Sequence, residues 1–161
     1  MTRREVLALI SAVPFATRQL VAADGKTPLY FSTEEFQLLD TLVELIIPAD
    51  DHSPGAHAAG VAAYIDRTTA EAFNPDDRTS WNQGLAKINS NAQEKFGTSF
   101  LKADKDKQVS LLKAMDSAND PFFGQLKQST AFAYYSSDIG IHKDIEYKGN
   151  VILEQFVGYL P

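Results

Sequence analysis

The 161-residue chain contains no cysteine, and this absence excludes several kinds of site at once. Without thiols the chain cannot form a disulfide, bind zinc through thiolates, ligate an iron–sulfur cluster, use a cysteine nucleophile or attach haem covalently. A chain of this length buries enough apolar surface to be stable without such cross-links. With 44% hydrophobic and 22% charged residues, the sequence predicts one compact domain of ordinary globular composition.

Positive charge is also scarce, with 15 Lys and Arg residues against 21 Asp and Glu residues and a net charge of −6. Proteins that bind nucleic acid hold the phosphate backbone mainly with an excess of Lys and Arg, so this composition argues against a general nucleic-acid binder. The basic residues are unevenly distributed. Residues 1–23 have three arginines and one glutamate, a net charge of +2, which leaves −8 on residues 24–161.

The sequence has no apolar run of the roughly 20 residues that a membrane-spanning helix needs, so we expect no transmembrane span. Residues 1–23 instead combine Arg3-Arg4, a short apolar stretch and small residues up to Ala23, which is typical of an export signal cleaved near Ala23. The arginine pair in this context resembles the twin-arginine signal of the Tat pathway. The alternative is an amphipathic helix with two surface arginines. We expect a Tat signal at residues 1–23, a mature domain at 24–161 and a periplasmic location.

Most of the mature chain has apolar residues at helical spacing. Ser32 and Glu35 form a predicted capping box at the start of the first helix, and Pro48 ends it. Helical patterns are expected near residues 33–47, 56–73, 81–96, 104–115 and 121–135. No alternating pattern is long enough for a sheet, so the sequence predicts an all-α fold of about five helices with an irregular C-terminal tail from Ser136 onward.

Residues that could support chemistry are few. The sequence lacks the glycine-rich loops that bind dinucleotides or phosphate, and it lacks the Gly-x-Ser-x-Gly nucleophile elbow. Polar residues at 50–57 could offer metal ligands, although they lack the helical spacing of a bundle metal site. Ser136 or Ser137 with Asp138 and His142 could be read as a hydrolase, although turn capping explains these residues better. We therefore predict no catalytic, cofactor-binding or metal-binding residue in this chain.

Aromatic residues are concentrated in the last predicted helix, near residues 121–135. Phe122, Phe123, Phe132, Tyr134 and Tyr135 are more rings than one helix face can turn inward. Some must belong to the core, and the surplus predicts exposed apolar area. Patches of this kind mark surfaces that bind other proteins.

Three segments, in order, are distinctive. The first contains Ile-Ile-Pro-Ala-Asp at residues 46–50 and Ser-Pro-Gly-Ala at residues 53–56; the second covers 84–100 and the third 122–149. Together they span residues 32–150 and resemble the gluconate 2-dehydrogenase subunit 3 family. These are small, Tat-exported subunits of bacterial FAD-dependent sugar and polyol dehydrogenase complexes.

The resemblance implies a non-catalytic subunit that helps a large partner to mature and to cross the Tat pore. That partner is a flavoprotein of the glucose–methanol–choline oxidoreductase type, which holds FAD, and a cytochrome c subunit with haem c often accepts the electrons. An independent periplasmic protein that binds a ligand or metal is the alternative function.

We expect the large subunit to contact two segments that lack helical periodicity, the 48–57 loop and residues 133–147, whereas Leu39, Ile46, Leu85 and Leu112 should lie in the core. The alternative is that the tyrosines of these segments complete the core. The predicted interface residues are Pro48, Asp50, Asp51, His52, Pro54, Tyr134, Tyr135, Ser136, Ser137 and Tyr147.

Overall fold

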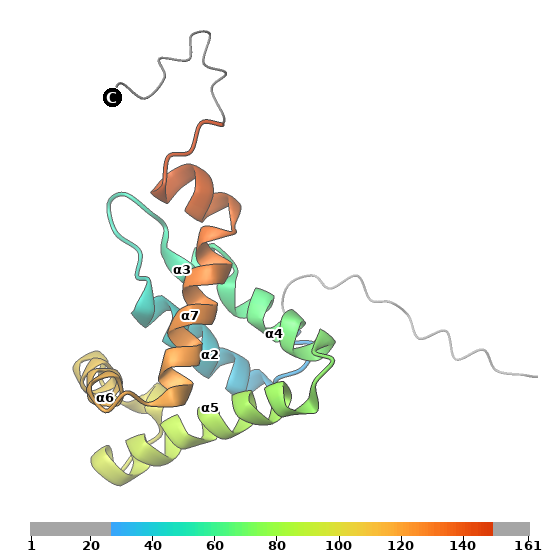
Figure 1. Cartoon of the computed structure of the whole chain (residues 1–161). Helices are drawn as coiled ribbons and strands as arrows, with labels where there is room; N and C mark the ends of the chain where they lie inside the picture. The colour runs from blue at the N-terminus through green and yellow to red at the C-terminus, as the bar shows by residue number, and fades with distance from the viewer. Residues whose placement is uncertain (1–26, 150–161) are drawn as a thin grey trace, which may run out of the picture.

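The computed structural model describes residues 27–149, and the predicted export signal, with Arg3 and Arg4, lies outside them. Six α-helices and two short helical turns follow one another, with no strand among the described residues (Figure 1). The elements are α2 (Thr33–Ile46), α3 (Gly55–Ala58), α4 (Val61–Glu71), α5 (Pro75–Phe96), the 3-10 turn η1 (Phe100–Lys102), α6 (Lys105–Ser117), α7 (Pro121–Tyr135) and the π-helical turn η2 (Gly140–Asp144). The predicted all-α fold is confirmed, and five of these helices have 11 residues or more.

The ends of the helices follow local sequence signals. The Ser32–Glu35 capping box is present, with the Glu35 N–H donating to Ser32 Oγ at 3.3 Å and the Ser32 N–H donating to Glu35 Oε2 at 2.9 Å. Gly60 adopts a φ of +69°, which divides the expected 56–73 helix into α3 and α4. The α5 helix begins at Pro75, earlier than the apolar pattern indicated, because the Asn74 side chain caps it and proline suits the first helical position.

The α2 helix lies at the centre and contacts α3, α4, α5, η1 and α7. It buries Leu38, Leu39, Leu42 and Val43 almost completely. The α7 helix runs past α2, from α5 and α6 at one end to η2 at the other (Figure 1). Its inward face is the one that the apolar spacing predicts: Phe122, Phe123, Leu126, Thr130, Ala133 and Tyr134.

Among the residues expected in the core, Leu39, Leu85 and Leu112 are buried, whereas Ile46 is half-buried against the core surface. The chain enters the fold through residues 29–31, whose three N–H groups donate to the buried carboxylate of Asp66 at 2.5, 3.0 and 2.9 Å. Within residues 27–149, none of the helices combines the length and the apolar character that crossing a bilayer requires.

Candidate partner interface

The loop between α2 and α3 has a fixed backbone. The Asp50 carboxylate accepts hydrogen bonds from the N–H groups of Ser53 at 2.7 Å and His52 at 2.9 Å, and the Asp50 N–H donates to the Ser53 carbonyl at 2.9 Å. The bonds from Ser53 and His52 hold the pKa of Asp50 below its ordinary value. Residues 50–53 are therefore held in a hydrogen-bonded turn, although they lie outside any helix.

Glu44 on α2 closes the base of the same loop. Its two carboxylate oxygens accept from the N–H groups of Ala49 at 2.9 Å and His57 at 2.8 Å. Gly55 has a φ of +80°, and a Cβ atom there would lie only 2.5 Å from the Ala49 nitrogen. Glycine is therefore needed where the chain passes back under the loop.

The loop lies against the C-terminal end of α7 (Figure 1). The Ser53 hydroxyl is buried and hydrogen-bonded to the Tyr134 hydroxyl. At the surface, His52 Nε2 donates to the Asp144 carbonyl of η2 at 3.1 Å. The two segments that the sequence analysis assigned to one interface thus touch each other, a contact that no sequence pattern indicated.

The segment after α7 is more regular than its sequence suggests. The Ser137 hydroxyl donates to the Tyr134 carbonyl at 2.6 Å and accepts from the Gly140 N–H at 3.0 Å. A Cβ atom on Gly140 would lie 2.0 Å from the Tyr134 carbonyl oxygen, so the chain can turn back into η2 only because this residue is glycine. The expected irregular tail therefore begins with a capped helical turn.

The hydrolase alternative is not supported by this geometry. His142 Nδ1 donates to the Tyr147 carbonyl at 3.1 Å, and its Nε2 lies 3.6 Å from Asp138. Among the hydrogen bonds of the described residues, none joins His142 to Ser136 or Ser137. The Ser137 hydroxyl instead caps the turn, as the simpler interpretation of this sequence predicted.

The metal alternative meets a similar difficulty. Within residues 27–149 no group of three or more His, Cys, Asp or Glu side chains is arranged to bind a metal. The loop donors are occupied by the protein itself, since His52 and Asp50 bond to the backbone and His57 Nδ1 lies 2.6 Å from an Asp40 carboxylate oxygen.

Most predicted interface residues lie at the surface. The exposed ones are Pro48, Asp50, Asp51, His52, Pro54, Tyr135, Ser136 and Tyr147. Ser137 is half-buried. Tyr134 is fully buried, so its assignment to the contact surface is corrected: it faces inward at the helical spacing of Leu126, Thr130 and Ala133, and its ring belongs to the core.

Two side chains at this surface have perturbed pKa values. The hydrogen bond to the Asp144 carbonyl raises the pKa of His52, against a smaller opposing effect of burial, and the carboxylates of Glu146, Asp144 and Asp50 add to the increase. Burial raises the pKa of Tyr135, as does its hydrogen bond to the nearby Asp144 carboxylate. Tyr135 therefore presents a neutral hydroxyl at any physiological pH.

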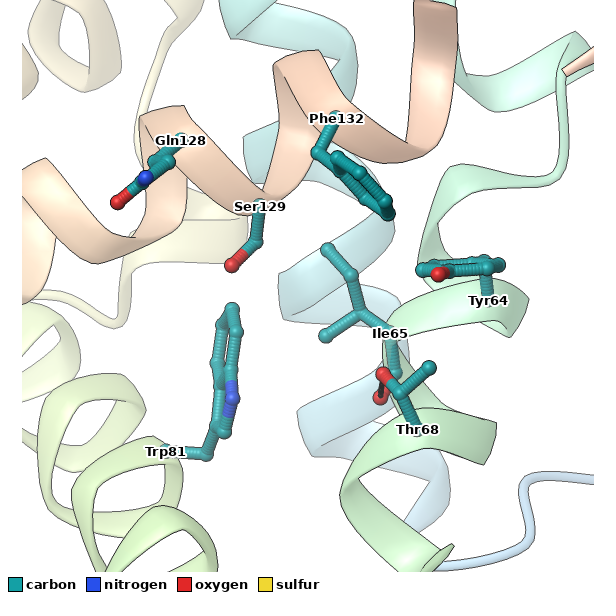
Figure 2. A pocket seen from close by; sticks show the side chains of 7 residues that line it. All are labelled: Tyr64, Ile65, Thr68, Trp81, Gln128, Ser129 and Phe132. Carbon is teal, nitrogen blue, oxygen red and sulfur yellow. Dashed lines mark hydrogen bonds between the residues drawn. The ribbon is translucent and has the colours of Figure 1, made fainter. Parts of the chain in front are cut away.

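Sequence analysis did not place Phe132 at the interface, yet its side chain is 62% exposed. The centroid of its ring lies 6.3 Å from the ring centroid of Tyr64 on α4. The two rings flank a groove of about 350 Å³ between α4, α5 and α7, with Trp81 at its other side (Figure 2). Phe132 does not share the helical spacing of the buried residues of α7. This spacing was the sequence signal that could have predicted its exposure.

An all-α domain with several exposed aromatic rings near the end of one helix is typical of a protein that binds another protein. The sequence model of the gluconate 2-dehydrogenase subunit 3 family matches residues 33–151, and the chain belongs to this family. No curated protein and no solved structure matches the chain.

Proposed function

We propose that this chain is the non-catalytic small subunit of a periplasmic FAD-dependent sugar or polyol dehydrogenase complex. In this proposal it binds a large flavoprotein of the glucose–methanol–choline type, stabilises it during maturation and supplies the Tat signal for both. FAD belongs to the large subunit, and haem c belongs to a cytochrome subunit where one is present. Family membership supports the assignment to such a complex.

The observation that carries the proposal is a set of exposed aromatic rings on the C-terminal half of α7 and just after η2. We call the exposed rings of Phe132, Tyr135 and Tyr147 the aromatic surface; they are 62%, 46% and 45% exposed. Tyrosine and phenylalanine supply large contact area at a low cost in side-chain entropy, as interface anchors do. Phe132 and Tyr135 project from α7, and the turn that follows this helix is held by the Ser137 hydroxyl, so little backbone ordering is needed on binding.

Capture of the flavoprotein by the small subunit tests the interface. The two chains are co-expressed, and the small subunit is purified through a tag. Tyr135→Ala and Phe132→Ala should each reduce capture about tenfold or more, because anchors of this kind dominate binding energy. Their melting temperatures should change little, since both rings project from the surface.

Phe73→Ala is the matched control, because Phe73 is a fully exposed ring on the α4–α5 turn, away from the aromatic surface. It should leave capture intact. Equal capture by Tyr135→Ala, Phe132→Ala and Phe73→Ala would contradict the proposed interface.

The export part of the proposal depends on Arg3 and Arg4. Replacing both by lysine should leave the small subunit, and any flavoprotein bound to it, in the cytoplasm. Dehydrogenase activity is then measured in periplasmic and cytoplasmic fractions. Unchanged periplasmic activity would show that these arginines do not form a Tat signal, while leaving the interface test unaffected.

A further inference from the structure

The contact between His52 and η2 joins two segments that are 92 residues apart in sequence. At the core side of this contact the link is the buried Ser53–Tyr134 hydrogen bond, which does not depend on charge near neutral pH. At the surface side the link is the bond from His52 Nε2 to the Asp144 carbonyl at 3.1 Å. Only this outer bond has a donor whose charge changes near neutral pH.

The surroundings of His52 carry charges of both signs. On its own loop the neighbours are Asp50 and Asp51, and the Asp50 carboxylate accepts the His52 N–H at 2.9 Å. His52 also lines a shallow cavity of about 570 Å³ together with residues of η2 and of the segment after it. These residues are His142, Lys143, Glu146, Tyr147 and Lys148. Asp144 supplies the accepting carbonyl, and its carboxylate bonds to the Tyr135 hydroxyl.

We propose that His52 acts as a pH-sensitive clasp, which holds η2 firmly against the 48–54 loop when its imidazole is protonated and less firmly when it is neutral. The clasp thereby controls how rigidly Tyr135 and Tyr147, two of the three rings of the aromatic surface, are held. Its relevance to the flavoprotein rests on the proposed function, whereas the clasp itself is a property of this chain alone.

The direction of the effect follows from the bonds. A neutral imidazole donates an ordinary N–H to the Asp144 carbonyl, whereas an imidazolium donates a charge-assisted bond that is about twice as strong. The carboxylates of Asp50, Asp144 and Glu146 favour the cation, whereas Lys143 and Lys148, which line the same cavity, carry the opposite charge. While His52 is bonded to the Asp144 carbonyl, this bond and the carboxylates together raise the pKa of His52. The bonded state therefore favours the imidazolium over the neutral imidazole.

The pH window has a definite sign. Two states are compared: one in which His52 is bonded to the Asp144 carbonyl and one in which this bond is broken. If the pKa of His52 is higher in the bonded state, protonation stabilises that state, and the stabilisation is complete below the ordinary pKa of about 6.5. This contribution is lost as the pH rises through the raised value. The clasp should therefore be tight in mildly acidic solution and loosen progressively above about pH 6.5.

Amide hydrogen exchange of the full chain, in the absence of any partner, measures the clasp directly. The reporters are the N–H groups of Ile145 and Tyr147, which bond to the carbonyls of Gly140 and Ile141 at 3.0 Å. Wild type is compared with His52→Gln at each pH, because the side-chain amide keeps a donor but does not titrate. Comparison at equal pH cancels the intrinsic pH dependence of exchange.

We expect the ratio of wild-type to His52→Gln exchange rates at these two amides to rise about two- to fivefold between pH 5.5 and pH 8, allowing for the exposure of His52. His57→Gln, in which an exposed histidine of α3 is changed, should follow wild type at both amides. The Ile88 amide of α5 should show no change in the ratio.

A ratio that does not vary with pH would overturn the proposal, as would an equal effect of His57→Gln. A histidine ring titration by NMR that places the pKa of His52 at or below its ordinary value would overturn it as well. None of these results depends on the flavoprotein, so failure of the clasp and failure of the proposed interface are distinguishable.

Discussion

Replacing Gly84 by alanine tests a close approach between α5 and α7. Gly84 is buried on α5 opposite the first turn of α7, and a Cβ atom there would lie 2.0–2.2 Å from three ring carbons of Phe122. The Phe122 ring is only 7% exposed and packs edge-on against Trp81, with the ring centroids 5.6 Å apart. The ring has little room to move, so the added methyl group must displace one helix from the other.

Two opposing contributions set the magnitude. Alanine is favoured over glycine in a helix by about 1 kcal/mol. Forcing extra atoms into a well-packed core costs about 1–3 kcal/mol, and the contact at Gly84 lies at the severe end. Gly84→Ala should therefore lower the free energy of unfolding by about 1–2 kcal/mol, or about 3–8 °C in melting temperature for a domain of this size.

Gly124→Ala is the matched control. Gly124 lies on the exposed side of α7, and a Cβ atom there meets nothing within 4 Å. This variant gains the helix preference without the overlap, so it should raise the free energy of unfolding by about 0.5–1 kcal/mol. Urea and thermal unfolding of both variants, and of Gly84→Ala combined with Phe122→Leu, measure the difference. A Gly84→Ala protein as stable as the Gly124→Ala protein would refute the reasoning, and partial rescue by Phe122→Leu is expected.

Three further predictions concern buried polar groups. Ser53→Ala and Tyr134→Phe should each cost about 1–3 kcal/mol in urea unfolding by leaving one hydroxyl unpaired, and the double variant should cost less than their sum. Asp66→Asn should cost about 2 kcal/mol, because an amide NH₂ group then faces some of the three N–H donors ahead of α2; an unchanged urea midpoint would contradict this. Although burial opposes it, the bonds from Lys87 and the first N–H groups of α7 lower the pKa of Asp120. Its stabilisation is therefore present above about pH 3.9 and lost as the pH falls below that value, and Asp120→Asn should flatten acid unfolding in this range.

The helices could be predicted from the sequence because their signals are local. The Ser32 capping box and the Pro121 start of α7 are read within a few residues, and the structure contains both. The inward face of α7 also follows from spacing alone, since apolar side chains three and four residues apart share one side of a helix. Its buried residues confirm the spacing from Phe122 to Tyr134.

Contacts between distant segments could not be predicted in this way. Helical spacing places Gly84 on the inward face of α5, three residues after Trp81, but it does not indicate that this glycine meets the Phe122 ring of α7. The contact between His52 and Asp144 depends on where α7 ends relative to the 48–54 loop, which is set by the packing of α2 and α7. Such a relation is a property of the assembled domain.

The neighbouring residues Tyr134 and Tyr135 show where the sequence analysis failed and why. Both were assigned to the interface for their aromatic character, yet Tyr134 is fully buried and Tyr135 is 46% exposed. The spacing that correctly placed Leu126, Thr130 and Tyr134 on one face of α7 already separated the two tyrosines. Position on the helix should therefore have taken precedence over residue type.

The burial of Tyr134 gives the aromatic surface its support. Its hydroxyl reaches Ser53 beneath the loop, while the adjacent Tyr135 ring packs edge-on against it, with the ring centroids 5.2 Å apart. The exposed ring of Tyr135 thus packs on a side chain that is itself held by the 48–54 loop. A substitution at Tyr134 should therefore disturb both stability and binding, whereas Tyr135→Ala should reduce binding with little loss of stability.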